Sequence, residues 1–150
     1  MRLNNKTAIV TGGASGFGKG IVEKFIKEGA NVVIADINYE LAKELADSIG
    51  KNAFAIKVDV SKKNEVDSMI NQSVEQFSEV NILVQNAAIG MKPQPLLETS
   101  EELFDKLYAI NVKSVFFLTQ KLAKILEQSG NNSDPSRVIN VGSIDGIGIP

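Results

Sequence analysis

The sequence contains no cysteine and no histidine among its 150 residues. Without cysteine, the chain has no disulfide, no thiolate nucleophile and no zinc–sulfur site. Without histidine, it lacks the commonest general base and the commonest metal ligand. We therefore predict no metal site, and any acid–base chemistry must come from other side chains.

The chain also lacks a basic stripe and a long hydrophobic run. Its formal net charge is -2 and its Lys and Arg are scattered, so neither nucleic acid nor an anionic membrane surface is an expected partner. No apolar stretch is long enough to cross a bilayer, and residues 1–6 have no apolar core of a signal peptide. We expect a cytoplasmic protein.

The sequence does contain enough apolar material for one domain. Hydrophobic residues make up 43% of the chain, which allows a sizeable core, whereas the length is short for two domains. Short β-branched runs lie at 7–10, 31–35, 53–58, 80–84 and 137–141, and the segments between them have helical spacing. This alternation is typical of parallel β–α units.

Glycine and serine mark the ends of the expected helices. Gly29 and Gly50 are the expected stops of the first two helices, and Ser61 is the expected N-cap of the third. Ser100 begins a long fourth helix over about 101–128. The apolar stripe of this helix is too wide to be covered by one face of a sheet alone, so part of it could contact a partner protein.

The most informative segment is a glycine-rich turn between the first strand and the first helix. Gly12, Gly16 and Gly18 let the backbone turn sharply and approach a ligand closely. The N–H groups at the start of the following helix favour an anion such as a pyrophosphate. Asp36 ends the second apolar run, where its carboxylate can accept hydrogen bonds from an adenosine ribose. The two features together predict a dinucleotide, NAD.

Two other interpretations of this turn are open. Residues 13–19 read G-x-x-x-x-G-K, the start of a nucleoside triphosphate loop, but Gly20 has no hydroxyl to bind magnesium. The glycines could also form a turn with a purely structural role.

With four further motifs in order, the chain resembles the short-chain dehydrogenase/reductase family over its whole length. These motifs are the pair Asp59-Val60, the segment 85–88 with the sequence Gln-Asn-Ala-Ala, Asn111 and Ser143. The resemblance implies a Rossmann-type doubly wound parallel sheet in a three-layer α/β/α arrangement. It also implies hydride transfer between a nicotinamide and a small alcohol or carbonyl substrate.

The resemblance assigns a set of residues to the cofactor. Asp36 selects NAD over NADP, because a 2′-phosphate beside it would meet like charge. Asp59 contacts the adenine in the family, although it could instead cap a helix. Asn86 supports the sheet and lines the cofactor, or simply bonds its own loop. The expected cofactor-binding residues are Thr11, Gly12, Ser15, Gly16, Phe17, Gly18, Asp36, Ile37, Asp59, Val60, Asn86, Ala87 and Ala88.

Two residues are assigned to catalysis by the same resemblance. Asn111 would anchor a water in the proton relay, with a buried structural amide as the alternative. Ser143 would donate a hydrogen bond to a substrate carbonyl, with a turn serine as the alternative. Within segment 85–88, Gln85 and Ala88 depart from the N-N-A-G pattern of the family, and Ala88 would narrow the approach to the cofactor.

The family's Tyr-x-x-x-Lys pair after the fifth strand is not in this sequence. Tyr39 and Lys43 have that spacing, but they follow the second strand and are expected far from the nicotinamide. We therefore expect residues 1–150 to be an incomplete NAD-binding domain of a larger dehydrogenase, inactive alone. The complete protein is expected to be a dimer or tetramer that uses the long helix. The alternative is a non-catalytic dinucleotide-binding or regulatory module.

Overall fold

A computed structural model describes residues 1–143. The sheet contains β1 (Thr7–Thr11), β2 (Asn31–Asp36), β3 (Ala53–Lys57), β4 (Ile82–Gln85) and β5 (Arg137–Asn140). All pairs are parallel, in the order β3-β2-β1-β4-β5. The expected strands are therefore confirmed, with ends that differ by one or two residues.

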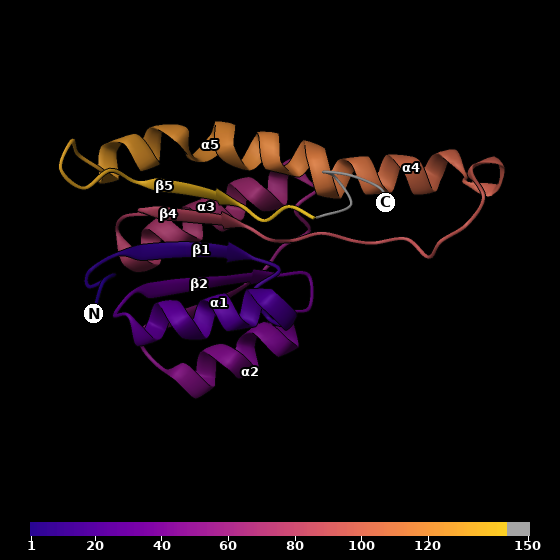
Figure 1. Cartoon of the computed structure of the whole chain (residues 1–150). Helices are drawn as coiled ribbons and strands as arrows, with labels where there is room; N and C mark the ends of the chain where they lie inside the picture. The colour runs from indigo at the N-terminus through magenta and orange to yellow at the C-terminus, as the bar shows by residue number, and fades with distance from the viewer. Residues whose placement is uncertain (144–150) are drawn as a thin grey trace.

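Helices connect the strands and cover both faces of the sheet (Figure 1). They are α1 (Gly16–Lys27), α2 (Tyr39–Ile49), α3 (Lys63–Phe77), η1 (Leu96–Glu98), α4 (Glu101–Tyr108), η2 (Ala109–Lys113) and α5 (Ser114–Ser129). The segment η2 is a π-helical stretch that joins α4 to α5. The predicted fourth helix is therefore continuous in direction but interrupted in hydrogen bonding.

Two apolar layers sandwich the sheet because neighbouring side chains on a buried strand point to opposite faces. Ile9 packs in the layer beneath α3 and α5, whereas Ala8 and Val10 pack in the layer beneath α1 and α2. These strand residues are completely buried. The predicted three-layer α/β/α arrangement is confirmed.

The helix ends follow local sequence with one exception. The Ser100 hydroxyl accepts a hydrogen bond from the Leu103 N–H at 3.2 Å, and Gly50 ends α2. Ser61 was wrongly predicted as the N-cap of α3, which is Lys62. The Ser61 hydroxyl instead donates to the Asp59 carboxylate at 2.6 Å, so this local bond replaces the cap.

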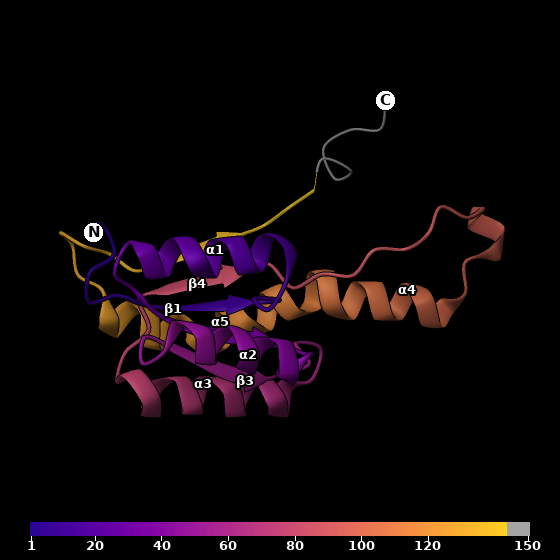
Figure 2. The ribbon, with the colours of Figure 1, turned by 90° about the horizontal axis from the view of Figure 1, so that it is seen from below.

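Two parts of the fold remain exposed although they are apolar. Strand β5 is exposed along its whole length, with Val138 and Ile139 each 42% exposed. Helix α4 extends beyond the carboxyl ends of the strands, away from the sheet (Figure 2). Among residues 1–143, no helix is both long and apolar enough to span a membrane.

Candidate functional site

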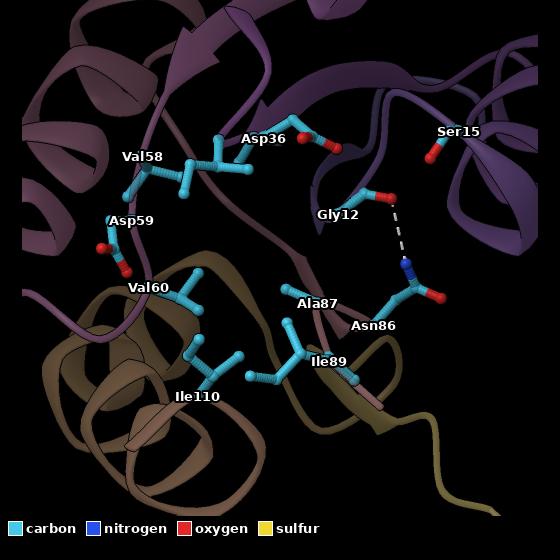
Figure 3. A pocket seen from close by; sticks show the side chains of 13 residues that line it. Gly12, Ser15, Asp36, Val58, Asp59, Val60, Asn86, Ala87, Ile89 and Ile110 are labelled. Atoms are coloured by element: carbon cyan, nitrogen blue, oxygen red, sulfur yellow. Dashed lines mark hydrogen bonds between the residues drawn. The ribbon is translucent and has the colours of Figure 1, made fainter. Parts of the chain in front are cut away.

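A cleft of about 270 Å³ lies at the carboxyl ends of the strands. The strand order reverses between β1 and β4, and ligands of open α/β sheets bind at such a switch point. Figure 3 shows Asp36, Asp59, Ala87 and Ile110 converging on the cleft from four different segments. The cleft is lined by Gly12, Ser15, Ala35, Asp36, Ile37, Val58, Asp59, Val60, Asn86, Ala87, Ala88, Ile89 and Ile110.

The glycine-rich turn brings the backbone of β1 close to the start of α1. Gly12 has φ +63°, a left-handed conformation that favours glycine. A Cβ on Gly18 would lie 2.0 Å from the Gly12 carbonyl oxygen and 2.7 Å from Asn86 Nδ2, so no side chain fits there. This close approach leaves the first N–H groups of α1 at the mouth of the turn, where a phosphate could accept from them.

Thr11 and Asn86 hold the turn against the end of β4. Thr11 is 1% exposed. Its hydroxyl accepts hydrogen bonds from the N–H groups of Asn86 and Ala87, each at 3.1 Å. In return, Asn86 Nδ2 donates to the Thr11 carbonyl at 3.0 Å and to the Gly12 carbonyl at 3.1 Å. Figure 3 shows the bond to Gly12. The Asn86 side chain therefore bonds the glycine-rich turn rather than its own loop, and the residue also lines the cleft.

The Asp36 carboxylate faces the cleft from the end of β2. Its Oδ2 accepts from the Ala14 N–H at 3.0 Å, and its Oδ1 accepts from the Asn38 N–H at 2.9 Å. An ionised carboxylate has about four acceptor positions, so two further donors can be accommodated. The two hydroxyl groups of a ribose match this remaining capacity.

Asp59 lies across the cleft from Asp36. Its Oδ1 accepts from the backbone N–H and the hydroxyl of Ser61, at 3.0 and 2.6 Å. Burial acts to raise the pKa of Asp59, but these hydrogen bonds and the nearby Lys62 and Lys106 outweigh it and lower that pKa. The carboxylate therefore stays ionised and can accept a hydrogen bond. The predicted alternative, a helix cap, does not describe it, since Lys62 holds the N-cap position of α3.

Asn111 is clamped to the loop that follows β4. Its Nδ2 donates to the Ile89 carbonyl at 2.8 Å, and its Oδ1 accepts from the Ile89 N–H at 2.9 Å. The residue lies within η2, and single π-helical turns are frequent at functional sites. The alternative of a buried amide was wrong about burial, because Asn111 is exposed, although its amide does bond backbone atoms, those of Ile89.

Ser143 follows β5 on the same edge of the sheet and is exposed. It does not line the cleft, and neither do Thr11, Gly16, Phe17 and Gly18. Thr11 and Gly18 shape the turn from behind, whereas Phe17 is 86% exposed. The structure therefore gathers nine of the thirteen expected cofactor residues around one cavity.

Four lining residues were not predicted. Each of them adjoins a predicted residue, since Ala35 precedes Asp36 and Val58 precedes Asp59. In the same way, Ile89 follows Ala88 and Ile110 precedes Asn111. The signal that would have found them is an apolar residue directly beside each predicted site residue at a strand or helix end. They give the cleft apolar walls suited to a flat ring.

Comparison with known proteins identifies the family. The family model described as short chain dehydrogenase matches residues 6–149. The chain belongs to this family. It is 38% identical to sorbitol dehydrogenase from Cereibacter sphaeroides over 143 residues, which cover 95% of the chain and 54% of that protein. It is 35% identical to 3beta-hydroxysteroid dehydrogenase 2 from Eggerthella lenta over 149 residues, covering 97% and 56%.

A solved structure agrees with these relatives. The crystal structure of 3-ketoacyl-(acyl-carrier-protein) reductase from Brucella melitensis complexed with NADH superposes with a TM-score of 0.90 at 38% identity. The superposition covers 94% of this chain and 58% of that one. The predicted fold class and family are thus confirmed, and the chain spans about half the length of the curated relatives it matches.

Proposed function

We propose that the chain forms the NAD-binding part of a short-chain oxidoreductase that transfers hydride between the cofactor and an alcohol or carbonyl compound. The observation that supports this most directly is the cleft at the switch point, where the glycine-rich turn, Asp36 and Asn86 meet. The turn fits the cofactor because a Cβ on Gly18 would fill the space that the close backbone approach requires. Family membership favours the same conclusion.

The residues on the β2 side of the cleft would bind the adenosine half. The start of α1 would hold the pyrophosphate through backbone N–H groups, and Asp36 would accept from the ribose hydroxyls. A 2′-phosphate would bring more negative charge against the Asp36 carboxylate, so we propose NAD rather than NADP. Asp59 would accept from the adenine amine, with Val60 against the ring.

The residues on the β4 side would surround the nicotinamide half. Asn86, Ala87 and Ala88 line this part of the cleft, and Asn111 is held close to it through Ile89. When bound, the cofactor carries the hydride. Asn111 would hold a water of the proton relay, and Ser143 would donate a hydrogen bond to the substrate carbonyl.

The proton donor is proposed to come from a Tyr-x-x-x-Lys pair outside these 150 residues. Tyr39 and Lys43 line a separate groove beside β3, and Lys43 is paired with Asp47. We therefore expect residues 1–150 to bind NADH without turning over a substrate. The complete protein is proposed to be a cytoplasmic dimer or tetramer that acts on a small molecule.

Calorimetric titration of the chain with NADH tests the proposal. We expect saturable binding of NADH, weaker binding of NADPH, and no binding of ATP with magnesium. Absence of NADH binding would contradict the proposal, and magnesium-dependent ATP binding would favour a nucleoside triphosphate site. NADH binding without turnover in a longer protein that has the Tyr-x-x-x-Lys pair would favour the regulatory alternative.

A further inference from the structure

Gln85 is a buried amide at the point where three segments of the fold meet. It is the last residue of β4 and is 4% exposed. Its Nε2 donates to Thr119 Oγ1 on α5 and to Asn140 Oδ1 on β5, each at 2.9 Å. One side chain therefore joins β4, the edge strand β5 and helix α5. Figure 1 shows these three elements next to one another.

The hydrogen-bond pattern fixes the orientation of this amide. Thr119 Oγ1 already donates its proton to the Val115 carbonyl at 2.8 Å, so it can only accept from Gln85. Nε2 must then point toward Thr119, and both of its protons are used. Gln85 Oε1 is buried and has no hydrogen-bond partner among residues 1–143. Leaving this carbonyl oxygen buried and unpaired costs folding free energy, and the two hydrogen bonds of the side-chain nitrogen offset that cost.

Each of the three linked segments leads to a residue of the proposed site. Asn86 follows Gln85 directly, α5 continues from the η2 segment that holds Asn111, and β5 leads to Ser143. We propose that Gln85 is a positioning residue that fixes the Asn111 helix and the Ser143 strand relative to the end of β4. This proposal rests on the proposed function for its catalytic meaning, although the cross-links themselves do not depend on it.

The length of the side chain is central to this role. The family pattern named above has asparagine at this position, whose amide is one carbon–carbon bond closer to the backbone. From the end of β4, a shorter side chain would pull the amide back from both Thr119 and Asn140. The longer glutamine side chain therefore gives this position the reach to bond both the helix and the edge strand.

Amide hydrogen exchange of the isotope-labelled chain tests the two cross-links separately. The Val141 N–H donates to the Gln85 carbonyl at 3.0 Å and reports on the end of β5. The Ile89 N–H donates to Asn111 Oδ1 and reports on the helix side. The Arg137 N–H donates to the Asn81 carbonyl at 2.9 Å, at the opposite end of β5, and serves as an internal reference.

We expect Gln85→Leu to accelerate exchange at Val141 and at Ile89 by about fivefold relative to Arg137, since two hydrogen bonds are lost. Thr119→Val should accelerate Ile89 and spare Val141, whereas Asn140→Ala should accelerate Val141 and spare Ile89. Gln72→Leu, which removes only a bond to Ser68 within α3, is the matched control and should change neither site.

The results separate positioning from a general contribution to stability. Equal acceleration at Val141, Ile89 and Arg137 in Gln85→Leu would mean global destabilisation and would overturn the proposal, as would no change at all. If Gln85→Leu does not fold, Thr119→Val and Asn140→Ala test the proposal, because each removes only one cross-link. Both are expected to fold, since Asn140 is exposed and valine has nearly the same shape as threonine. If the unmodified chain does not bind NADH, the proposed function is contradicted. The exchange result for the Gln85 cross-links stays valid in that case.

Discussion

The Asp36 carboxylate accepts a hydrogen bond from the Ala14 N–H at 3.0 Å, so the end of β2 is tied to the glycine-rich turn. The same carboxylate accepts from the Asn38 N–H at the start of α2. Asp36 therefore holds the turn in place and also presents an acceptor to the cleft. A substitution here removes both effects.

We expect Asp36→Ala to weaken NADH binding by about tenfold to a hundredfold, the range for losing hydrogen bonds to a charged group. Binding of NADPH should weaken less, because the substitution also removes the like charge that faces a 2′-phosphate. Asp47→Ala changes the same charge on the outer face of α2, where Asp47 pairs with Lys43, and should leave both affinities unchanged. Equal losses for NADH and NADPH would contradict a role of Asp36 in choosing the cofactor.

The strands and most of the cleft could be predicted because their signals are local. Residues 32–34 are β-branched and residues 32–35 are apolar because this strand is buried on both faces, and this leaves a clear pattern in the sequence. The polar residues that follow the runs, Asp36 and Asp59, then fall at the carboxyl edge of the sheet. A parallel sheet brings these ends together whatever the details of the helices.

The features that were missed depend on contacts between distant segments. The π-helical turn at Ala109–Lys113 accompanies the pairing of Asn111 with Ile89, and nothing near residue 111 announces that partner. Gln85 is tied to Thr119 and Asn140, which are 34 and 55 residues away. Ser61 is the exception, because a local contact decides its role: it is a residue type that favours the N-cap, but its hydroxyl bonds to Asp59, two residues earlier.

Asp59 makes the folding stability of the chain depend on pH, and the sign of this dependence follows from its lowered pKa. Its pKa lies below the usual 3.8, so the ionised form contributes stability above that value and loses it as the pH falls through the lower folded pKa. We expect Ser61→Ala to raise the pKa of Asp59 back toward 3.8, because two of the lowering hydrogen bonds come from Ser61 and the substitution removes the hydroxyl. An NMR titration of the Asp59 carboxyl measures the change. Ser68→Ala on α3 is the control, and an unchanged Asp59 titration in Ser61→Ala would refute the assignment.

An exposed apolar stripe follows every fourth residue along α4, η2 and the start of α5. Phe104, Tyr108, Val112 and Phe116 are 61%, 52%, 50% and 60% exposed. Such a continuous stripe is typical of a protein–protein contact. If it forms the proposed dimer or tetramer contact, the double substitution Phe104→Glu and Phe116→Glu should weaken self-association by at least about tenfold.

Sedimentation equilibrium measures this association. Leu97→Glu is the control, because Leu97 is 98% exposed and lies on η1, outside the stripe. An unmodified chain that stays monomeric at high concentration would argue against the contact. An unchanged association constant in the double variant would place the contact elsewhere.

Gly18 and Gly20 lie two residues apart in α1. Gly20 has room for a methyl group, whereas Gly18 has none. A Cβ on Gly18 would meet the Gly12 carbonyl oxygen at 2.0 Å, and backbone cannot move aside easily, whereas a Cβ on Gly20 meets nothing within 4 Å. Gly18→Ala should therefore lower the free energy of unfolding by about 3 kcal/mol and abolish NADH binding. Gly20→Ala should raise that free energy by up to about 1 kcal/mol, because alanine favours a helix, and should preserve binding. Urea unfolding and NADH titration measure both variants, and equal behaviour would mean that α1 does not approach the turn as closely as the structure shows.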